Sequence, residues 1–289
     1  MVKQSERRAV FCAIAAAALY ALNSPVSKLL LSEVSSTMMA ALLYLGAGLG
    51  LLALRPFRKG RRELPLTKKD LPYTIGMVLL DIAAPICLMF GLTRTTAANA
   101  SLLNNFEIVA TALIALFVFK EQISKRLWAA IFLVTVSSIL LTVEDVSSLS
   151  FSIGSVFVLL ACVCWGFENN CTRMLSQKDP LEIVIIKGFG SGLGSLVIAL
   201  ALGEHIPRIR FLLAALLLGF FAYGLSICFY IYAQRELGAA KTSTHYALAP
   251  FIGVFLSFLM FREPPTLSFG TALAVMIAGA YLAATDTPA

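Results

Sequence analysis

The sequence is poor in charged residues. Only 13% of its 289 residues are Asp, Glu, Lys or Arg, whereas a soluble domain usually carries about 25%. Hydrophobic residues make up 59% of the chain. This composition excludes an ordinary soluble domain and predicts a protein that folds inside a lipid bilayer.

Residues suited to catalysis and metal binding are also scarce. There are two histidines, and the six cysteines all fall in apolar runs without the CxxC spacing of zinc or redox sites. No glycine-rich phosphate loop follows a strand, and no Ser/His/Asp set can be recognised. We therefore expect no metal, no cofactor and no enzymatic activity, and we interpret the cysteines as small buried residues.

Long apolar runs, in contrast, fill most of the chain. A helix needs about 20 such residues to cross the hydrocarbon layer, and continuous rather than alternating runs favour a helical bundle over a barrel. Ten transmembrane helices are predicted, at residues 9–31, 34–54, 71–92, 95–119, 127–143, 151–175, 181–202, 209–233, 238–261 and 267–284. The fold class expected is an all-α membrane protein. We interpret the first segment as a retained helix rather than a cleaved signal peptide, because a related segment reappears later.

The basic residues are unevenly distributed. A net charge of +7 raises the question of nucleic-acid binding, but most of the 23 Lys and Arg residues lie in the N-terminal tail and in alternate loops, above all in residues 55–69. Under the positive-inside rule this pattern places the N-terminus and the C-terminus in the cytoplasm. We therefore expect the lipid bilayer and no nucleic acid as a partner. Binding of anionic lipid head groups is a second candidate role for the 55–69 loop.

The two halves of the sequence resemble each other. Residues 97–121 recur, altered, as residues 239–263 without a gap, and the glycine-rich run at 46–50 recurs at 190–194. Glycines spaced four apart permit close contact between helices. We expect that contact within one chain, with a homodimer interface as the alternative, so the protein is predicted to be a monomer or a homodimer.

An acidic, Ser-rich linker at residues 144–148 separates the halves. The predicted domains are two five-helix repeats, residues 1–145 and residues 146–289. Because five is odd, two such units in series face opposite ways across the membrane. In transporters such inverted-topology repeats accompany alternating access around a site near the bilayer midplane.

Several motifs carry a family resemblance. An aromatic-first, basic-last stretch occurs at residues 20–28 and 165–173, and Ala-Ala-x-x-Ser opens the fourth predicted helix of each half, with Phe, a basic residue and Glu after it. In these motifs the chain resembles the EamA family, the ten-helix branch of the drug/metabolite transporter superfamily, over residues 9–284. The resemblance implies secondary transport, often export, of amino acids and other small polar metabolites through a central cavity.

The sequence departs from the family pattern at two places. Proline is usual in the fourth helix of both halves, but here only Pro250 is present, and Ile108 stands at the matching position. A basic residue is common in the second helix of a half, and it is present as Lys187 but replaced by Leu43 in the first half.

Four charged residues are predicted at membrane depth: Asp81, Glu107, Glu168 and Lys187. Each costs at least about 2.5–3.5 kcal/mol if it faces lipid, so we expect them to pair with one another or to line a wet cavity. Lys187 is interpreted first as a structural partner of an acidic neighbour, with a substrate carboxylate as the alternative. Asp81 is either that partner or a proton site.

Polar residues accompany two of the carboxylates. Asn104, Asn105 and Glu107 lie on about one helical turn, where the carboxylate can bind a ligand amine, carry a proton or make a structural hydrogen bond. Glu168 and Asn169 form a second cluster, which is either a binding site or a polar contact that holds helices together.

Further candidates come from prolines and aromatic residues. Asn23 lies beside Pro25, which frees a backbone carbonyl for a ligand or a hinge. His245 and Tyr246 take the place of Leu103 and Asn104 in the second copy of the repeat, as a substrate contact, a proton carrier or packed residues. An aromatic wall for an amine or a ring is predicted from Trp165, Tyr223 and Tyr230, with ordinary packing as the alternative.

We therefore predict a secondary transporter in the inner (plasma) membrane of a bacterium. It moves a small polar or amphipathic metabolite by alternating access, alone or coupled to protons, with Pro25, Pro85 and Pro250 as flex points. Export is preferred on family resemblance, and uptake is the alternative. A non-transporting membrane sensor or assembly protein is less favoured, because no loop is predicted to be longer than residues 55–69.

Overall fold

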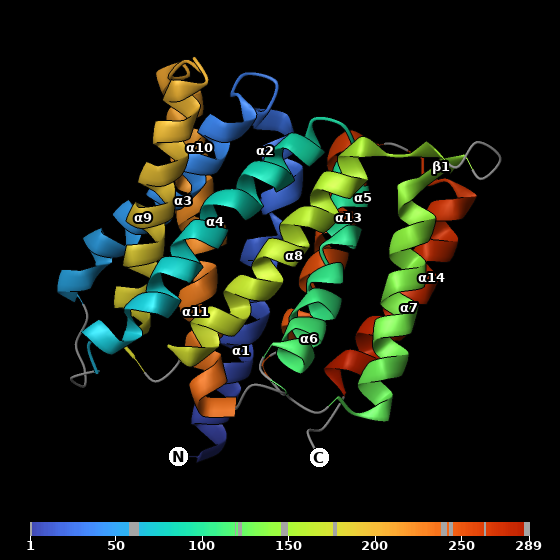
Figure 1. Ribbon diagram of the computed structural model, residues 1–289, viewed down its shortest axis with the longest axis horizontal. Coiled ribbons are helices and arrows are strands. Elements are labelled where there is room, and N and C mark those ends of the chain that lie inside the picture. The colour runs from blue at the N-terminus through green and yellow to red at the C-terminus, as the bar shows by residue number, and fades with distance from the viewer. Residues whose placement is uncertain are drawn as a thin grey trace.

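The computed structural model describes residues 2–57, 64–118, 120, 123–145, 150–175, 178–237, 242, 245–262 and 264–285, and most of them are helical (Figure 1). The first half contains α1 (Val2–Ala21), α2 (Asn23–Leu30), α3 (Ser36–Leu54), η1 (Arg55–Phe57), η2 (Lys68–Asp70), α4 (Leu71–Leu92), α5 (Ala97–Leu103), α6 (Phe106–Phe117) and α7 (Lys125–Thr142). The second half contains α8 (Ile153–Met174), α9 (Pro180–Ala201), α10 (Ile209–Gly219), the π-helical segment η3 (Phe220–Leu225), α11 (Ser226–Leu237), α13 (Ala249–Phe261) and α14 (Leu267–Ala284). Between the halves, β1 (Val143–Asp145) pairs antiparallel with β2 (Ser150–Phe151).

Within the described residues, nine helical stretches are long and apolar enough to cross a membrane. They correspond to nine of the ten predicted segments. The other, 238–261, contains the shorter apolar helix α13, and residues 238–241, 243 and 244 lie outside the described chain. The glutamates that end the two repeated stretches, at positions 121 and 263, and most of the 144–148 linker also lie outside it. The chain is a multi-pass helical membrane protein.

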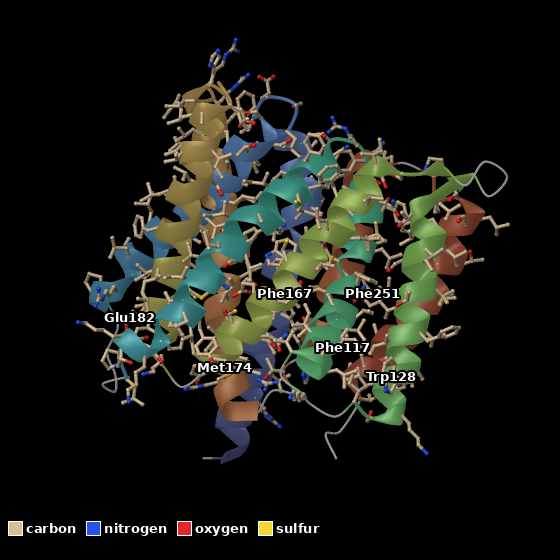
Figure 2. All side chains as sticks on the ribbon, in the orientation of Figure 1. Phe117, Trp128, Phe167, Met174, Glu182 and Phe251 are labelled. Atoms are coloured by element: carbon tan, nitrogen blue, oxygen red, sulfur yellow. The ribbon has the colours of Figure 1, made fainter. Side chains whose placement is uncertain are left out.

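The surface of the bundle is rich in apolar side chains. Phe117, Trp128 and Phe167, labelled in Figure 2, are all exposed, Phe117 by 73%. A contiguous apolar surface of this kind would aggregate in water. It suits lipid tails, whereas Asp81, Glu168 and Lys187 are buried in the interior.

Helices from the two halves pack against each other throughout the bundle. The second predicted span of each half meets its counterpart as α3 on α9, the fourth as α5 on α13, and the fifth as α7 on α14. The third span of each half packs instead against the first span of the other half, α4 on α8 and α11 on α1. Figure 1 shows α4 beside α8 across the front of the bundle and α7 beside α14 at one edge. The interior is therefore built jointly by both halves.

Three of the predicted continuous helices are interrupted. The first breaks at Leu22, where Pro25 has no N–H to offer the carbonyl of Ala21. The fourth breaks between α5 and α6, where the amide of Glu107 bonds to the carbonyl of Asn104, three residues back instead of four (3.1 Å). The eighth widens into a π-helix at Phe220–Leu225. Interruptions of this kind are frequent at functional sites.

The glycine-rich runs serve contacts inside the chain. A Cβ on Gly46 would lie 2.1 Å from the carbonyl oxygen of Leu216 in α10, and one on Gly190 would lie 3.0 Å from the side chain of Val78 in α4. These glycines therefore let α3 approach α10 and let α9 approach α4. This is the within-chain packing expected from their spacing.

The ends of the helices lie on two opposite sides of the bundle. Figure 1 shows that α1 begins and α14 ends on the same side, and β1 lies on the opposite side. On that opposite side Glu204, which follows α9, accepts hydrogen bonds from the Ser35 hydroxyl (2.8 Å) and the Met38 amide (2.7 Å) at the start of α3. This carboxylate fastens the second half of the chain to the first.

Candidate functional site

A buried ion-pair cluster lies where α4, α8 and α9 meet. The ammonium of Lys187 in α9 is 3.2 Å from Oδ2 of Asp81 in α4 and 2.7 Å from Oε1 of Glu168 in α8. All three residues are buried, and Asp81 has no exposed surface. Lys187 therefore joins a carboxylate of the first half to one of the second, and the pairing expected for it involves two partners rather than one.

Two hydroxyl groups complete this cluster. The Tyr44 hydroxyl in α3 donates to Oδ1 of Asp81 (2.7 Å), and Thr172, one turn along α8, donates to Oε1 of Glu168. Two carboxylates and one ammonium leave the cluster with one excess negative charge when all three groups are ionised. Neither hydroxyl was anticipated. Tyr44 directly follows Leu43, the position at which the first half lacks the basic residue, and this neighbouring position is the sequence signal for it.

We expect Tyr44→Phe to lower the free energy of unfolding by about 1–3 kcal/mol, because it leaves a fully buried carboxylate oxygen without its donor. The exposed Tyr232 offers the matched control, Tyr232→Phe, which should change stability by less than about 0.5 kcal/mol. Unfolding curves of the two purified variants in detergent test the difference. Equal effects would mean that the hydrogen bond to Asp81 contributes nothing.

A second polar cluster joins α6 to α8. The amide of Asn169 donates to Oε1 of Glu107 (2.6 Å) and to the hydroxyl of Thr111 (3.3 Å). Asn170 turns instead to the backbone and donates to the carbonyls of Thr111 and Gly166. Glu168 and Asn169, adjacent in sequence, therefore serve different clusters. Glu107 is nevertheless within electrostatic reach of Glu168 and Lys187.

A row of five tyrosines runs through the interior. Ring centroids are 5.0 Å apart for Tyr44 and Tyr223, 6.1 Å for Tyr223 and Tyr20, 5.8 Å for Tyr20 and Tyr246, and 4.9 Å for Tyr246 and Tyr230. The row begins at the tyrosine that binds Asp81. It draws on α1, α3, η3 and α11 and on the residues before α13, so both halves contribute. Aromatic faces of this kind attract cations.

The remaining candidates lie around this row. The Asn23 amide donates to the Tyr223 hydroxyl (2.9 Å) and accepts from Ser27 (3.1 Å). Of the residues predicted to form an aromatic wall, Tyr223 and Tyr230 belong to the tyrosine row, whereas Trp165 is packed in the apolar core and makes no ring contact with the row in the described structure. His245 is half-buried.

Asn104 and Asn105 are buried in the turn between α5 and α6. The Asn105 amide donates to the carbonyl of Leu102 (3.3 Å), a side-chain bond that competes with the helical pattern. The Cys162 thiol of α8 contacts the carbonyl of Leu103 (3.6 Å), which the irregular turn has released. The polar stretch predicted in this helix is therefore the place where the helix is broken.

A cavity of about 570 Å³ opens at the side of the bundle opposite to the start of α1. Its lining residues are Leu31, Val34, Ser35, Ser36, Thr37, Ile86, Cys87, Phe90, Thr93, Phe157, Leu202 and Glu204. No group of three or more His, Cys, Asp or Glu residues able to hold a metal ion occurs within the described residues.

A model of the EamA-like transporter family matches residues 7–143 and matches again at residues 152–285. The chain belongs to this family. An uncharacterized transporter of Methanothermobacter thermautotrophicus is 27% identical over 93% of this chain and 84% of its own length. The uncharacterized transporter YyaM of Bacillus subtilis is 21% identical over 70% of this chain and 69% of its own.

A solved structure, described only as the crystal structure of a protein, superimposes on this EamA-like chain with a TM-score of 0.68. The two sequences are 16% identical, and the match covers 95% of this chain and 96% of the other. At that identity the likeness shows the shared fold alone. The family resemblance of the sequence is confirmed, and it identifies the protein as a membrane transporter.

Proposed function

We propose that this EamA-family protein is a secondary transporter of small polar or amphipathic metabolites, amino acid-like or cationic and zwitterionic, that works by alternating access. The observation that carries the proposal is the concentration of charged and polar side chains in the interior, between helices of both halves. Such groups are costly inside a membrane and mark substrate and ion pathways. Export across the inner membrane of a bacterium is the direction favoured by the family.

The charge of the interior supports the substrate class. Asp81, Glu107 and Glu168 supply three carboxylates, and Lys187 supplies one ammonium. Three negative charges against one positive charge favour a ligand that carries an amine, or the uptake of protons. The tyrosine row adds cation-binding ring faces beside these carboxylates.

The mechanism proposed is a rocking of two inverted repeats, residues 1–145 and 146–289, around this interior. Two observations support it: the family model matches each half separately, and counterpart helices of the halves pack against each other. The architecture proposed has ten spans, with both termini in the cytoplasm and with Pro25, Pro85 and Pro250 near the moving segments. The irregular turn at Asn104 and Asn105 joins them as a flex point.

A thermal-shift screen of the purified protein against amino acids, amines and nucleosides tests the substrate class. A ligand that binds the folded protein raises the free energy of unfolding by RT ln(1 + [L]/Kd), and the unfolding temperature rises with it. We expect shifts from amine-bearing compounds and none from their carboxylate analogues of the same size. Shifts from anionic compounds alone would contradict the proposed class.

We expect Glu107→Gln to reduce the transport rate at least about 10-fold and to flatten its pH dependence, because the amide cannot hold a proton or pair with an amine. The Asn169 contact has the space to accept the isosteric side chain, so folding should be preserved. The measurement is initial flux in proteoliposomes across a pH series. Glu33→Gln, at an exposed position after α2, is the control. Unchanged flux and an unchanged pH profile in Glu107→Gln would remove this residue from the site.

A further inference from the structure

A small cavity lies beside two of the helix interruptions and the first turn of α13. Its volume is about 10 Å³, which is room for about one water molecule or one dehydrated small ion. Ala21 and Ser24 line it on either side of the break between α1 and α2, Asn104 lines it from the break between α5 and α6, and Pro250 lines it from the first turn of α13. Broken membrane helices of this kind hold substrates and coupling ions in transporters.

Two side-chain oxygens at this cavity are buried without a partner. Ser101 is 2% exposed and Asn104 is 7% exposed, and both line the cavity. Neither Ser101 Oγ nor Asn104 Oδ1 has a hydrogen-bond partner within the described part of the chain. A buried polar atom left unpaired costs about 1–3 kcal/mol, so two in one cavity call for a ligand.

A backbone oxygen joins them. In a regular helix the carbonyl of Ala21 would accept from the amide of residue 25, but that residue is Pro25 and has no N–H. This carbonyl oxygen and Ser101 Oγ both lie close to Gly253 of α13. The point that a Cβ on Gly253 would occupy lies 2.8 Å from Ser101 Oγ and 3.3 Å from the carbonyl oxygen of Ala21. Ser101 Oγ and the carbonyl oxygen of Ala21 therefore lie against the same face of Gly253, and all three residues line the cavity.

The electrostatic surroundings favour a cation over a neutral occupant. The carbonyl oxygen of Ala21, left without an N–H by Pro25, presents a partial negative charge at the cavity. Glu107 follows Asn104 by three residues and is within electrostatic reach of Tyr20, which also lines the cavity. Neutral oxygen ligands and a space of one water suit a monovalent ion, whereas divalent ions are usually held by carboxylate ligands.

We propose that this cavity is a binding site for Na⁺, held by Ser101 Oγ, Asn104 Oδ1 and the carbonyl oxygen of Ala21. The site goes beyond the proposed transport function, because it binds its ion whether or not a solute is present. Since its three ligands come from the end of α1 and from α5 and the turn that follows it, bound Na⁺ stabilises the packing of these two segments. Release of the ion frees these two segments to separate.

The test is the unfolding temperature of the full-length protein in detergent, measured in NaCl and in choline chloride at the same ionic strength and with no solute. At ten times the dissociation constant of Na⁺ we expect the midpoint to rise by about 3 °C or more. LiCl and KCl series report the selectivity, and we expect K⁺ to be the weakest because of its size. Equilibrium binding of radioactive ²²Na⁺ to the same preparation gives an independent readout.

Matched variants separate this site from general salt effects. Ser101→Ala removes one ligand and Gly253→Ala fills the cavity, so both should abolish the Na⁺-dependent shift and the ²²Na⁺ binding. Ser195→Ala removes another buried hydroxyl that has no partner within the described residues, on α9, and should keep both. Should either site variant fail to fold, the other variant and ²²Na⁺ binding by the unaltered protein still test whether Na⁺ binds at this site.

Equal midpoints in Na⁺ and choline together with no ²²Na⁺ binding would overturn the proposal and leave an ordered water only. A shift that persists in Ser101→Ala and Gly253→Ala would overturn it as well, because the ion would then bind elsewhere. Neither readout involves a transported solute, so a protein that binds Na⁺ but moves no metabolite would contradict the proposed function alone.

Discussion

Replacement of Lys187 by methionine is expected to lower the free energy of unfolding by about 3–5 kcal/mol, the largest loss from any single side chain in the interior. The ammonium is the positive partner of both Asp81 and Glu168, which are buried in two different halves of the chain. Methionine fills a similar volume but leaves two carboxylates close together without a counter-charge. Unfolding of the purified variant in mixed detergent micelles measures the loss.

A neutral version of the whole cluster is the control for this prediction. In the triple variant Lys187→Met, Asp81→Asn, Glu168→Gln no buried charge remains, and replacement of buried ion pairs by neutral groups is often well tolerated. We expect the triple variant to regain most of the stability lost in Lys187→Met, while transport stays impaired. If the triple variant is as unstable as the single one, packing of the lysine stem rather than its charge explains the effect.

Gly219→Ala is expected to lower the free energy of unfolding by about 3 kcal/mol, at the upper end of overpacking effects. The new Cβ would lie 2.0 Å from the carbonyl oxygen of Leu43, so that α10 and α3 must move apart. A backbone atom cannot turn aside as a flexible side chain can. Thermal and detergent-induced unfolding of the variant, followed by tryptophan fluorescence, give the measurement.

Gly270→Ala is the matched control, because a Cβ there has no atom within 4 Å among the described residues. Because Gly270 lies inside α14, its replacement should be slightly stabilising, since alanine stabilises a helix by about 1 kcal/mol relative to glycine. A similar loss in Gly219→Ala and Gly270→Ala would show that glycine contributes through backbone flexibility and not through the close approach of α3 and α10.

Much of the fold could be predicted from the sequence because the bilayer imposes simple requirements. Within the part of the chain that the structure describes, the long apolar runs correspond to nine helices of spanning length. The cost of a charge facing lipid places Asp81, Glu168 and Lys187 in the interior, and once they are there each carboxylate needs the ammonium. These inferences depend only on composition and on local sequence.

The parts that could not be predicted depend on contacts between distant residues. Ring contact between Tyr20 and Tyr223 joins positions about 200 residues apart, and no local pattern separates these tyrosines from those that face lipid. Trp165 looked similar in sequence but makes no ring contact with these tyrosines within the described residues. The break at Asn104 was also missed, because the matching proline is absent and the interruption arises from side chains that compete with the helix.

The sodium site and the carboxylate clusters suggest how one interior handles two ligands. Asn104 faces the small cavity, and Glu107, one turn later, faces Asn169 of α8. A conformational change at the turn between α5 and α6 would therefore alter both places together. This coupling depends on the proposed site and on the proposed transport mechanism.

Solute counterflow in proteoliposomes tests the central claim most directly. Purified protein is reconstituted with an amine-bearing ligand from the thermal-shift screen trapped inside, and entry of the same radiolabelled compound is followed from outside. The account predicts transient accumulation of label by the unaltered protein, and accumulation at least about 10-fold slower in Glu107→Gln but not in Glu33→Gln. No accumulation above protein-free vesicles for any ligand that stabilises the protein, or equal accumulation in Glu107→Gln, would contradict it.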